Sequence, residues 1–170
     1  MNNYKIYNNE DSIFLEIFTS HRHRASLVFV TGIATTMLLI PILIVFFVIK
    51  ELSIGVIISW ILAWSISGFF VKLYLWNKYG KEVFVMNNNY LKVYNDYKYF
   101  KENYRCYQFT KLNITFFVGT EAFFAKEEVK NIDIHQLSEI GFQLDKDVVI
   151  SHKELPILKI IEIAKQISNV

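Results

Sequence analysis

The sequence predicts an α+β membrane protein, in which a transmembrane α-hairpin precedes an antiparallel β-roll capped by a C-terminal helix. Three observations predict this class. Two long uncharged stretches lie close together, short alternating stretches follow them, and an amphipathic stretch closes the chain. The chain has 170 residues, 53% of them hydrophobic, and a mean hydropathy of +0.27. This length allows one compact domain beside the apolar segments.

The two uncharged stretches predict membrane-spanning helices at 25–49 and 52–71, within a hairpin over 25–72. The first holds 25 residues, 16 of them Leu, Ile, Val or Phe, and the second holds 20, with 11 of these types. On an insertion scale the apolar residues of the first favour the bilayer by roughly 5–10 kcal/mol before polar costs. Only Lys50 and Glu51 separate the stretches. The alternative is a buried helix pair of a soluble protein, in which uncharged runs of this length are rare.

Basic residues flank the predicted hairpin unevenly, and this predicts its orientation. Five Lys or Arg lie beside its outer ends, whereas Lys50 is alone in the connection. Because positive charge is retained in the cytoplasm, both termini are expected there. The predicted headgroup and topology anchors are His21, Arg22, His23, Arg24, Lys72, Trp76, Lys78 and Lys81.

Small residues recur every fourth position in the second stretch and predict a groove for close helix packing. They are Gly55, Ser59, Ala63 and Ser67, and the first stretch offers Gly32 and Thr36 at the same spacing. The expected arrangement packs the two helices of one chain against each other. The alternative partner is a second copy, which would make the protein a homo-oligomer.

Residues 77–170 alternate as short strands do and end in a helix. The predicted strands cover 82–86, 90–95, 104–109, 112–118, 122–125, 129–134 and 148–150, and the predicted helix covers 154–168. Ser151 and Glu154 have the spacing of a capping box for that helix. Residues 1–24 form a separate N-terminal cytoplasmic segment. They are expected to form a β-hairpin that joins this sheet, or alternatively to lie on the membrane surface.

Several classes of chemistry lack their motifs in this sequence. Asp133 and His135 would share one face of a strand, but no recognisable nucleophile motif accompanies them, so no catalytic residue is predicted. The single cysteine, Cys106, is expected to be a core thiol, and neither a metal site nor a cofactor is predicted. A formal net charge of +2 does not favour nucleic acid.

A tyrosine-rich stretch supplies the candidate binding residues. Tyrosine is rigid and amphipathic, and it is enriched at protein interfaces. The predicted partner face consists of Tyr90, Lys92, Tyr94, Tyr97, Tyr99 and Lys101. Ordinary strand composition is the alternative explanation, since tyrosine favours half-buried sheets. Contact with the membrane surface is another.

Three parts of the chain carry a resemblance to a known family: the hairpin, the stretch LYLWNKYGKEVFVMNNNYLKVYNDYKYFKEN after it, and the closing ELPILKIIEIAKQI. They resemble small bacterial two-helix membrane proteins with a pleckstrin-homology-like (PH-like) domain. The residues that carry the resemblance are Trp76, Gly80-Lys81-Glu82, Asp96-Tyr97-Lys98 and Phe100-Lys101. The resemblance implies a bent antiparallel sheet with a terminal helix, in a multi-pass protein of the bacterial inner membrane.

Two functions are therefore expected. The first is a non-enzymatic, membrane-tethered interaction module whose tyrosine-rich sheet binds a protein partner or lipid. The alternative is an immunity or defence protein whose hairpin counters a membrane-directed toxin.

Overall fold

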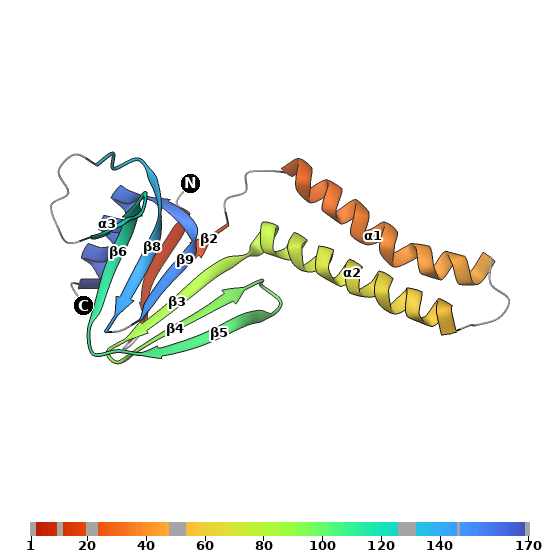
Figure 1. Ribbon diagram of the computed structural model, residues 1–170, viewed down its shortest axis with the longest axis horizontal. Coiled ribbons are helices and arrows are strands. Elements are labelled where there is room, and N and C mark those ends of the chain that lie inside the picture. Colours follow the sequence, from red (N-terminus) through yellow and green to blue (C-terminus); the bar gives the residue numbers. More distant parts are fainter. Residues whose placement is uncertain are drawn as a thin grey trace. The chain divides into compact units, whose positions relative to one another are not determined.

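The computed structural model describes residues 3–9, 12–19, 24–47, 54–125, 132–145 and 147–168. It is an α+β structure with two antiparallel sheets and a C-terminal helix, which confirms the predicted class at this level. The chain divides into two units (Figure 1). We call Met1–Phe18, Lys81–Asp96 and Phe100–Val170 the β unit, and Thr19–Gly80 with Tyr97–Tyr99 the helical unit.

The β unit contains a five-stranded sheet whose strands follow chain order. These strands are β1 (Tyr4–Asn9), β2 (Ser12–Phe18), β3 (Lys81–Asn87), β4 (Tyr90–Asp96) and β5 (Lys101–Gln108). Strand β2 pairs with β3 along its length, with Leu15 opposite Phe84. The described N-terminal residues Tyr4–Asn9 and Ser12–Phe18 are therefore part of the sheet.

The second sheet has the order β7-β6-β8-β9. Its strands are β6 (Leu112–Val118), β7 (Glu121–Phe124), β8 (Leu137–Leu144) and β9 (Val148–Pro156), and helix α3 (Ile157–Ser168) follows directly. Strand β8 was not among the predicted strands. The strand predicted at 129–134 is wrong for Ile132–Ile134, which belong to no strand, and the rest of it lies outside the described residues.

Helix α3 begins later than predicted, because Glu154–Pro156 belong to β9. Ser151 and Glu154 therefore form no capping box. Backbone carbonyls replace it: the N–H of Ile157 donates to the Gln136 carbonyl at 3.0 Å, and the N–H of Leu158 donates to that of Ile134 at 2.9 Å. Two of the N–H groups that a helix start leaves without intrahelical partners are thus satisfied.

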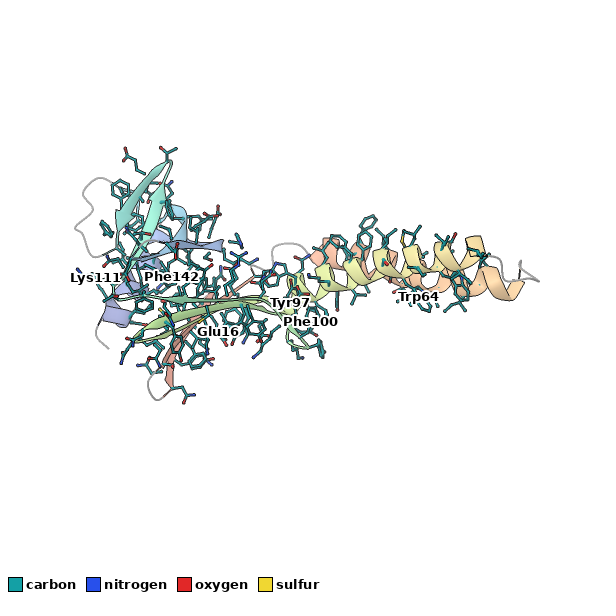
Figure 2. The ribbon with its side chains drawn as sticks, turned by 60° about the horizontal axis from the view of Figure 1, so that its bottom comes forward. Glu16, Trp64, Tyr97, Phe100, Lys111 and Phe142 are labelled. Atoms are coloured by element: carbon teal, nitrogen blue, oxygen red, sulfur yellow. The ribbon has the colours of Figure 1, made fainter. Side chains whose placement is uncertain are left out.

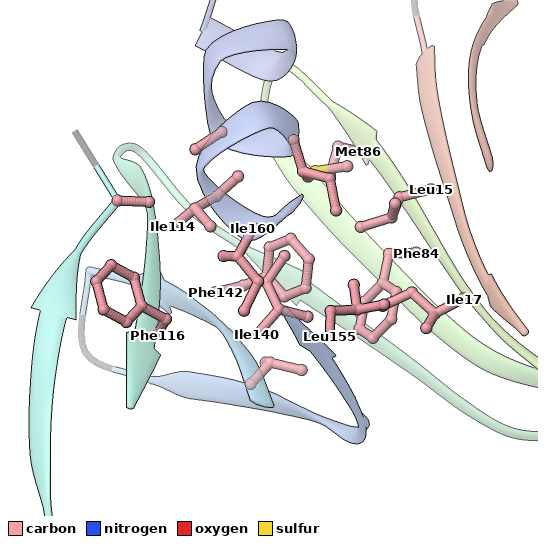
Figure 3. Close-up of a cluster of buried hydrophobic side chains, with 14 of the residues drawn as sticks. Leu15, Ile17, Phe84, Met86, Ile114, Phe116, Ile140, Phe142, Leu155 and Ile160 are labelled. Atoms are coloured by element: carbon pink, nitrogen blue, oxygen red, sulfur yellow. The ribbon is translucent and has the colours of Figure 1, made fainter. Parts of the chain in front are cut away.

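The core lies between the two sheets and is closed by α3 (Figure 3). The rings of Phe84 on β3 and Phe142 on β8 have centroids 4.7 Å apart. Ile157, Ile160 and Ile163 of α3 are fully buried in the same cluster. Strand alternation and the apolar stripe of α3 thus bury one shared set of side chains.

The helical unit contains α1 (Arg24–Phe47) and α2 (Ile54–Tyr79). Among the described residues, only α2 is long and apolar enough to cross a membrane, and its most apolar window has a hydropathy of 2.1 with 6% of it buried. The apolar stretch within α1, Val28–Ile44, is shorter. The Ser67 hydroxyl of α2 donates to the Ala34 carbonyl of α1 at 3.2 Å. The two helices therefore pack against each other.

Candidate interaction surfaces

The five-stranded sheet has one face turned away from the core, which we call the outer face. Because side chains alternate along a strand, the neighbours of core residues such as Leu15, Phe84 and Leu91 point to this side. Its members are Lys5, Tyr7, Phe14, Glu16, Lys81, Val83, Val85, Tyr90, Lys92, Tyr94, Asp96, Lys101 and Tyr104.

Aromatic rings and lysines cover part of the outer face. Tyr94 and Tyr104 stack with centroids 5.1 Å apart, and the Lys101 ammonium lies 5.0 Å from the Tyr94 ring. Val83, paired with Tyr94, is only 1% exposed, whereas Tyr104 is 65% exposed. The outer face thus contains a buried apolar residue, Val83, and an exposed aromatic residue, Tyr104.

A chain of charges crosses the same face. The Lys81 ammonium lies 2.7 Å from Glu16 Oε1 and 3.7 Å from Asp96 Oδ2. The Tyr7 hydroxyl also donates to Glu16 Oε1, at 3.1 Å. Burial, followed by the charge of Glu16, raises the pKa of Tyr7 to about 12. Tyr7 therefore remains a hydrogen-bond donor at physiological pH (Glu16 is labelled in Figure 2).

A second cluster lies at the C-terminal end of α2, within the helical unit. We call Lys72, Trp76, Tyr79, Tyr97, Lys98 and Tyr99 the helix-base cluster. The rings of Trp76 and Tyr97 have centroids 5.0 Å apart, and Tyr97 is 5% exposed. Tyr97 is labelled in Figure 2. The Lys72 ammonium lies 5.8 Å from the Tyr97 ring. The Lys98 ammonium lies 4.6 Å from the Tyr79 ring and 5.4 Å from that of Tyr99.

A backbone clasp fixes the base of α2. The Gly80 carbonyl accepts hydrogen bonds from the Thr19 N–H at 3.0 Å and the Thr19 hydroxyl at 2.7 Å. The Gly80 N–H donates to the Trp76 carbonyl at 2.8 Å. A Cβ at Gly80 would overlap that carbonyl and the Trp76 ring, so glycine is required here. Lys98 has a φ of 77°, which turns the chain between β4 and β5.

The predicted partner face is divided between the two units. Tyr90, Lys92, Tyr94 and Lys101 lie on the outer face, whereas Tyr97 and Tyr99 belong to the helical unit. The predicted residues therefore do not all belong to one unit, and their role in binding a partner stays a prediction.

Among the predicted anchors, Lys72 and Trp76 lie in the helix-base cluster, and the Lys78 ammonium bonds the Tyr74 hydroxyl at 2.9 Å. Lys81 instead joins the ion pairs of the outer face. His21, Arg22 and His23 lie outside the described residues, and Arg24 begins α1.

The predicted helix groove matches the structure only in part. Ser67 is buried and Ala63 half-buried, but Gly55 and Ser59 are exposed. On α1, Val30 and Ala34 are buried, whereas Gly32 and Thr36 are exposed. The contact line of α1 is thus rotated from the predicted one.

The structure reveals a buried polar site that sequence analysis missed. Glu82, 2% exposed, accepts hydrogen bonds from the Ser151 hydroxyl at 2.6 Å and from the backbone N–H of His152 at 3.2 Å. A cavity of about 50 Å³ adjoins it, lined also by Asn95 and Arg105. The available signal was a glutamate at the start of an otherwise apolar run, Val83–Met86.

A more open hollow of about 570 Å³ lies near the turns at the other end of the sheet, lined by Asn89, Tyr90, Gln108, Phe109, Thr110 and Asp145. Its one charged group, Asp145, accepts hydrogen bonds from the N–H groups of Thr110 and Lys111 at 2.7 and 2.9 Å. These bonds lower the pKa of Asp145. The carboxylate therefore stabilises the loop.

Two further expectations are corrected. Cys106 is exposed and is not a core thiol. Asp133 and His135 lie in a turn, where the carboxylate of Asp133 accepts the His135 N–H at 3.0 Å, so they are not strand neighbours. Within the described ranges, no group of three or more His, Cys, Asp or Glu side chains is placed to hold a metal ion.

Neither a family model nor a curated protein matches this chain.

Proposed function

We propose that this chain is a non-enzymatic, membrane-tethered interaction module, whose outer face binds a protein partner. The observation that carries the proposal is the exposure of α2. An 18-residue window with hydropathy 2.1 is only 6% buried, whereas a core helix of a soluble protein would be mostly covered. A large exposed apolar surface of this kind marks a contact with a membrane or with another protein.

The tether in this proposal is a two-helix hairpin of the bacterial inner membrane. Helix α1 would be its second span, since Phe29, Leu39 and Leu43 are at least half exposed along it. The excess of basic residues at the outer ends of the hairpin favours cytoplasmic termini. The β unit would then be a PH-like domain at the cytoplasmic surface.

A protein is the partner that the outer face suits best. Stacked tyrosines offer rigid amphipathic contacts, and Glu16, Lys81 and Asp96 place both signs of charge beside them. Nucleic acid would require a largely basic surface. Tethering raises the effective concentration of this surface for any partner in the same membrane.

Site-specific photocrosslinking in native membranes tests the proposal. A photoreactive amino acid replaces Tyr104 on the outer face or, as control, Phe124 on β7, which is 38% exposed. We expect a discrete adduct from position 104, lost in the Tyr94→Ser variant, and none from position 124. Equal adducts from both positions, or none from position 104, would contradict the proposal. An adduct between two copies of this chain would show that the outer face binds a second copy, so that the protein is a homo-oligomer and has no separate partner at this face.

Membrane attachment is tested separately by alkaline extraction of membranes. The chain should remain in the pellet, and its release into the supernatant would contradict the tether.

The alternative, an immunity protein acting through its hairpin, is favoured by the exposure of Gly55 and Ser59 on α2. It predicts adducts from a photoreactive group at Ser59 and none from position 104.

A further inference from the structure

The helical unit is basic at the end of its apolar helix. Its described residues include Arg24, Lys72, Lys78 and Lys98 and no aspartate or glutamate. Three of these four lie in the last turns of α2 or in the connection Tyr97–Tyr99. The preceding turn is apolar, and Phe69 is 63% exposed. If α2 spans the membrane as proposed, these lysines lie at the level of the lipid phosphates.

We propose that the helix-base cluster binds the phosphate headgroup of an anionic phospholipid, through the ammonium groups of Lys72 and Lys98 and the hydroxyl groups of Tyr79 and Tyr99. This inference deepens the proposed function and rests on it. The ligand chemistry is a phosphodiester at the membrane surface. Lysine binds phosphate as a point charge, and tyrosine hydroxyls donate additional hydrogen bonds.

Ring contacts hold both lysines before any ligand binds. Lys72 lies against Tyr97, and that ring packs on Trp76. Lys98 lies between Tyr79 and Tyr99, whose rings meet edge to face at 6.1 Å. A lysine that is already ordered loses less side-chain entropy on binding. The two lysines of the cluster are therefore expected to lose less side-chain entropy on binding a phosphate than lysines that project into water.

The backbone of the cluster is fixed as well. Thr19 and Gly80 clasp the last turn of α2, and the left-handed φ of Lys98 sets the direction of its side chain. Trp76 adds the amphipathic ring that is typical of the membrane interface. Charge, ring geometry and position at the end of an exposed apolar helix thus favour the same ligand.

Native mass spectrometry of the full chain in detergent tests the inference. Phosphatidylglycerol and phosphatidylcholine are added in equal amounts, and the bound lipid is counted. We expect about a tenfold preference for phosphatidylglycerol in the wild type, falling to less than twofold in the Lys72→Gln/Lys98→Gln double variant. The matched control, Lys111→Gln/Lys165→Gln, removes the same charge from the β unit and should keep the preference.

A wild type without preference would overturn the inference, as would equal loss in the control variant. A third arm adds inorganic phosphate in large excess. Displacement of the lipid by phosphate alone would identify a free-phosphate site and overturn the lipid assignment, whereas retention supports it.

The tyrosine hydroxyls have their own test, because substitution by phenylalanine keeps the rings. Tyr79→Phe/Tyr99→Phe should reduce the preference about threefold while both lysines stay ordered. An unchanged preference for phosphatidylglycerol would show that the two hydroxyl groups do not bind the lipid. A protein crosslinked from a photoreactive group at position 99, and lost when Lys72→Gln/Lys98→Gln is added, would show that the cluster binds a protein instead.

Failure of this inference differs from failure of the proposed function. Loss of lipid preference with retained pelleting and a retained adduct at position 104 rejects only the headgroup site. Release of the chain from alkaline-washed membranes rejects the tether itself.

Discussion

The Ser151 hydroxyl donates a 2.6 Å hydrogen bond to the buried carboxylate of Glu82, and this bond joins β9 of one sheet to β3 of the other. Buried carboxylates are costly unless they are hydrogen-bonded. The Glu82 carboxylate is also bonded by the His152 N–H. The pair therefore ties the two sheets together at a point where the core is polar.

We expect Ser151→Ala to lower the free energy of unfolding of the β unit by about 1.5–3 kcal/mol, because the carboxylate loses a short donor. Ser138→Ala is the control, since the Ser138 hydroxyl bonds only backbone groups, the N–H of Phe117 and the carbonyl of Glu139, and should cost about 1 kcal/mol. Hydrogen exchange of β3 amides in the full chain measures both. A smaller loss in Ser151→Ala than in Ser138→Ala would contradict this role.

Gly80→Ala should destabilise the helical unit by about 1–3 kcal/mol, because its Cβ overlaps the Trp76 carbonyl and ring. Gly68→Ala places its Cβ in open space within α2 and should be neutral or stabilising by up to about 1 kcal/mol. Thermal unfolding of the full chain in detergent, followed by Trp fluorescence, compares the two. Equal melting temperatures would show that the clasp tolerates a side chain.

Acid should weaken the β5–β6 loop through Asp145. Backbone hydrogen bonds from Thr110 and Lys111 lower the pKa of Asp145 below its unfolded value of about 4. A depressed carboxyl pKa stabilises the fold above the unfolded pKa, and this stabilisation is lost as the pH falls through the folded pKa. Asp145→Ala should therefore destabilise at pH 7 and have a diminishing effect toward about pH 2. Urea denaturation at both pH values measures this, and a pH-independent difference would contradict it.

Cysteines at Ala34 and Ser67 should form a disulfide in a Cys106→Ser background, because the Ser67 hydroxyl reaches the Ala34 carbonyl at 3.2 Å. Cysteines at Thr36 and Ala63, which belong to the predicted groove and lie close to the same level of the hairpin, should not, because Thr36 is exposed. Mild oxidation followed by proteolysis and mass spectrometry identifies the linked peptides. A link between positions 36 and 63 but not between 34 and 67 would restore the groove predicted from small-residue spacing.

The sheets were predictable where alternation is regular and turn residues are clear. Strands β3 and β4 flank Asn88 and Asn89, and both were predicted to within one residue. Strand β8 was not predicted: Ile140, Phe142 and Leu144 alternate as strand residues do, but Gly141 between them disfavours a strand. The structure explains that glycine: a Cβ there would overlap the Thr115 hydroxyl and crowd the Phe117 ring on the neighbouring strand.

The candidate surfaces could not be predicted from the spacing of residues in the sequence, because they depend on tertiary contacts. Tyr94 and Tyr97 are three residues apart, yet they belong to different units, because the turn at Lys98 packs Tyr97 on Trp76. The start of α3 was predicted too early for a similar reason. Its first N–H groups bond carbonyls about twenty residues back, at Ile134 and Gln136, which makes a local capping box unnecessary.

The neighbours Lys81 and Glu82 carry opposite charges to opposite sides of β3, the central strand of its sheet. A register slip by one residue would exchange them. An ammonium group would then face the hydrogen-bond donors of Ser151 and His152, and a carboxylate would face the carboxylates of Glu16 and Asp96. Misaligned pairings would thus be penalised on both sides at once, so this dipeptide selects the correct alignment during folding as well as stabilising it afterwards.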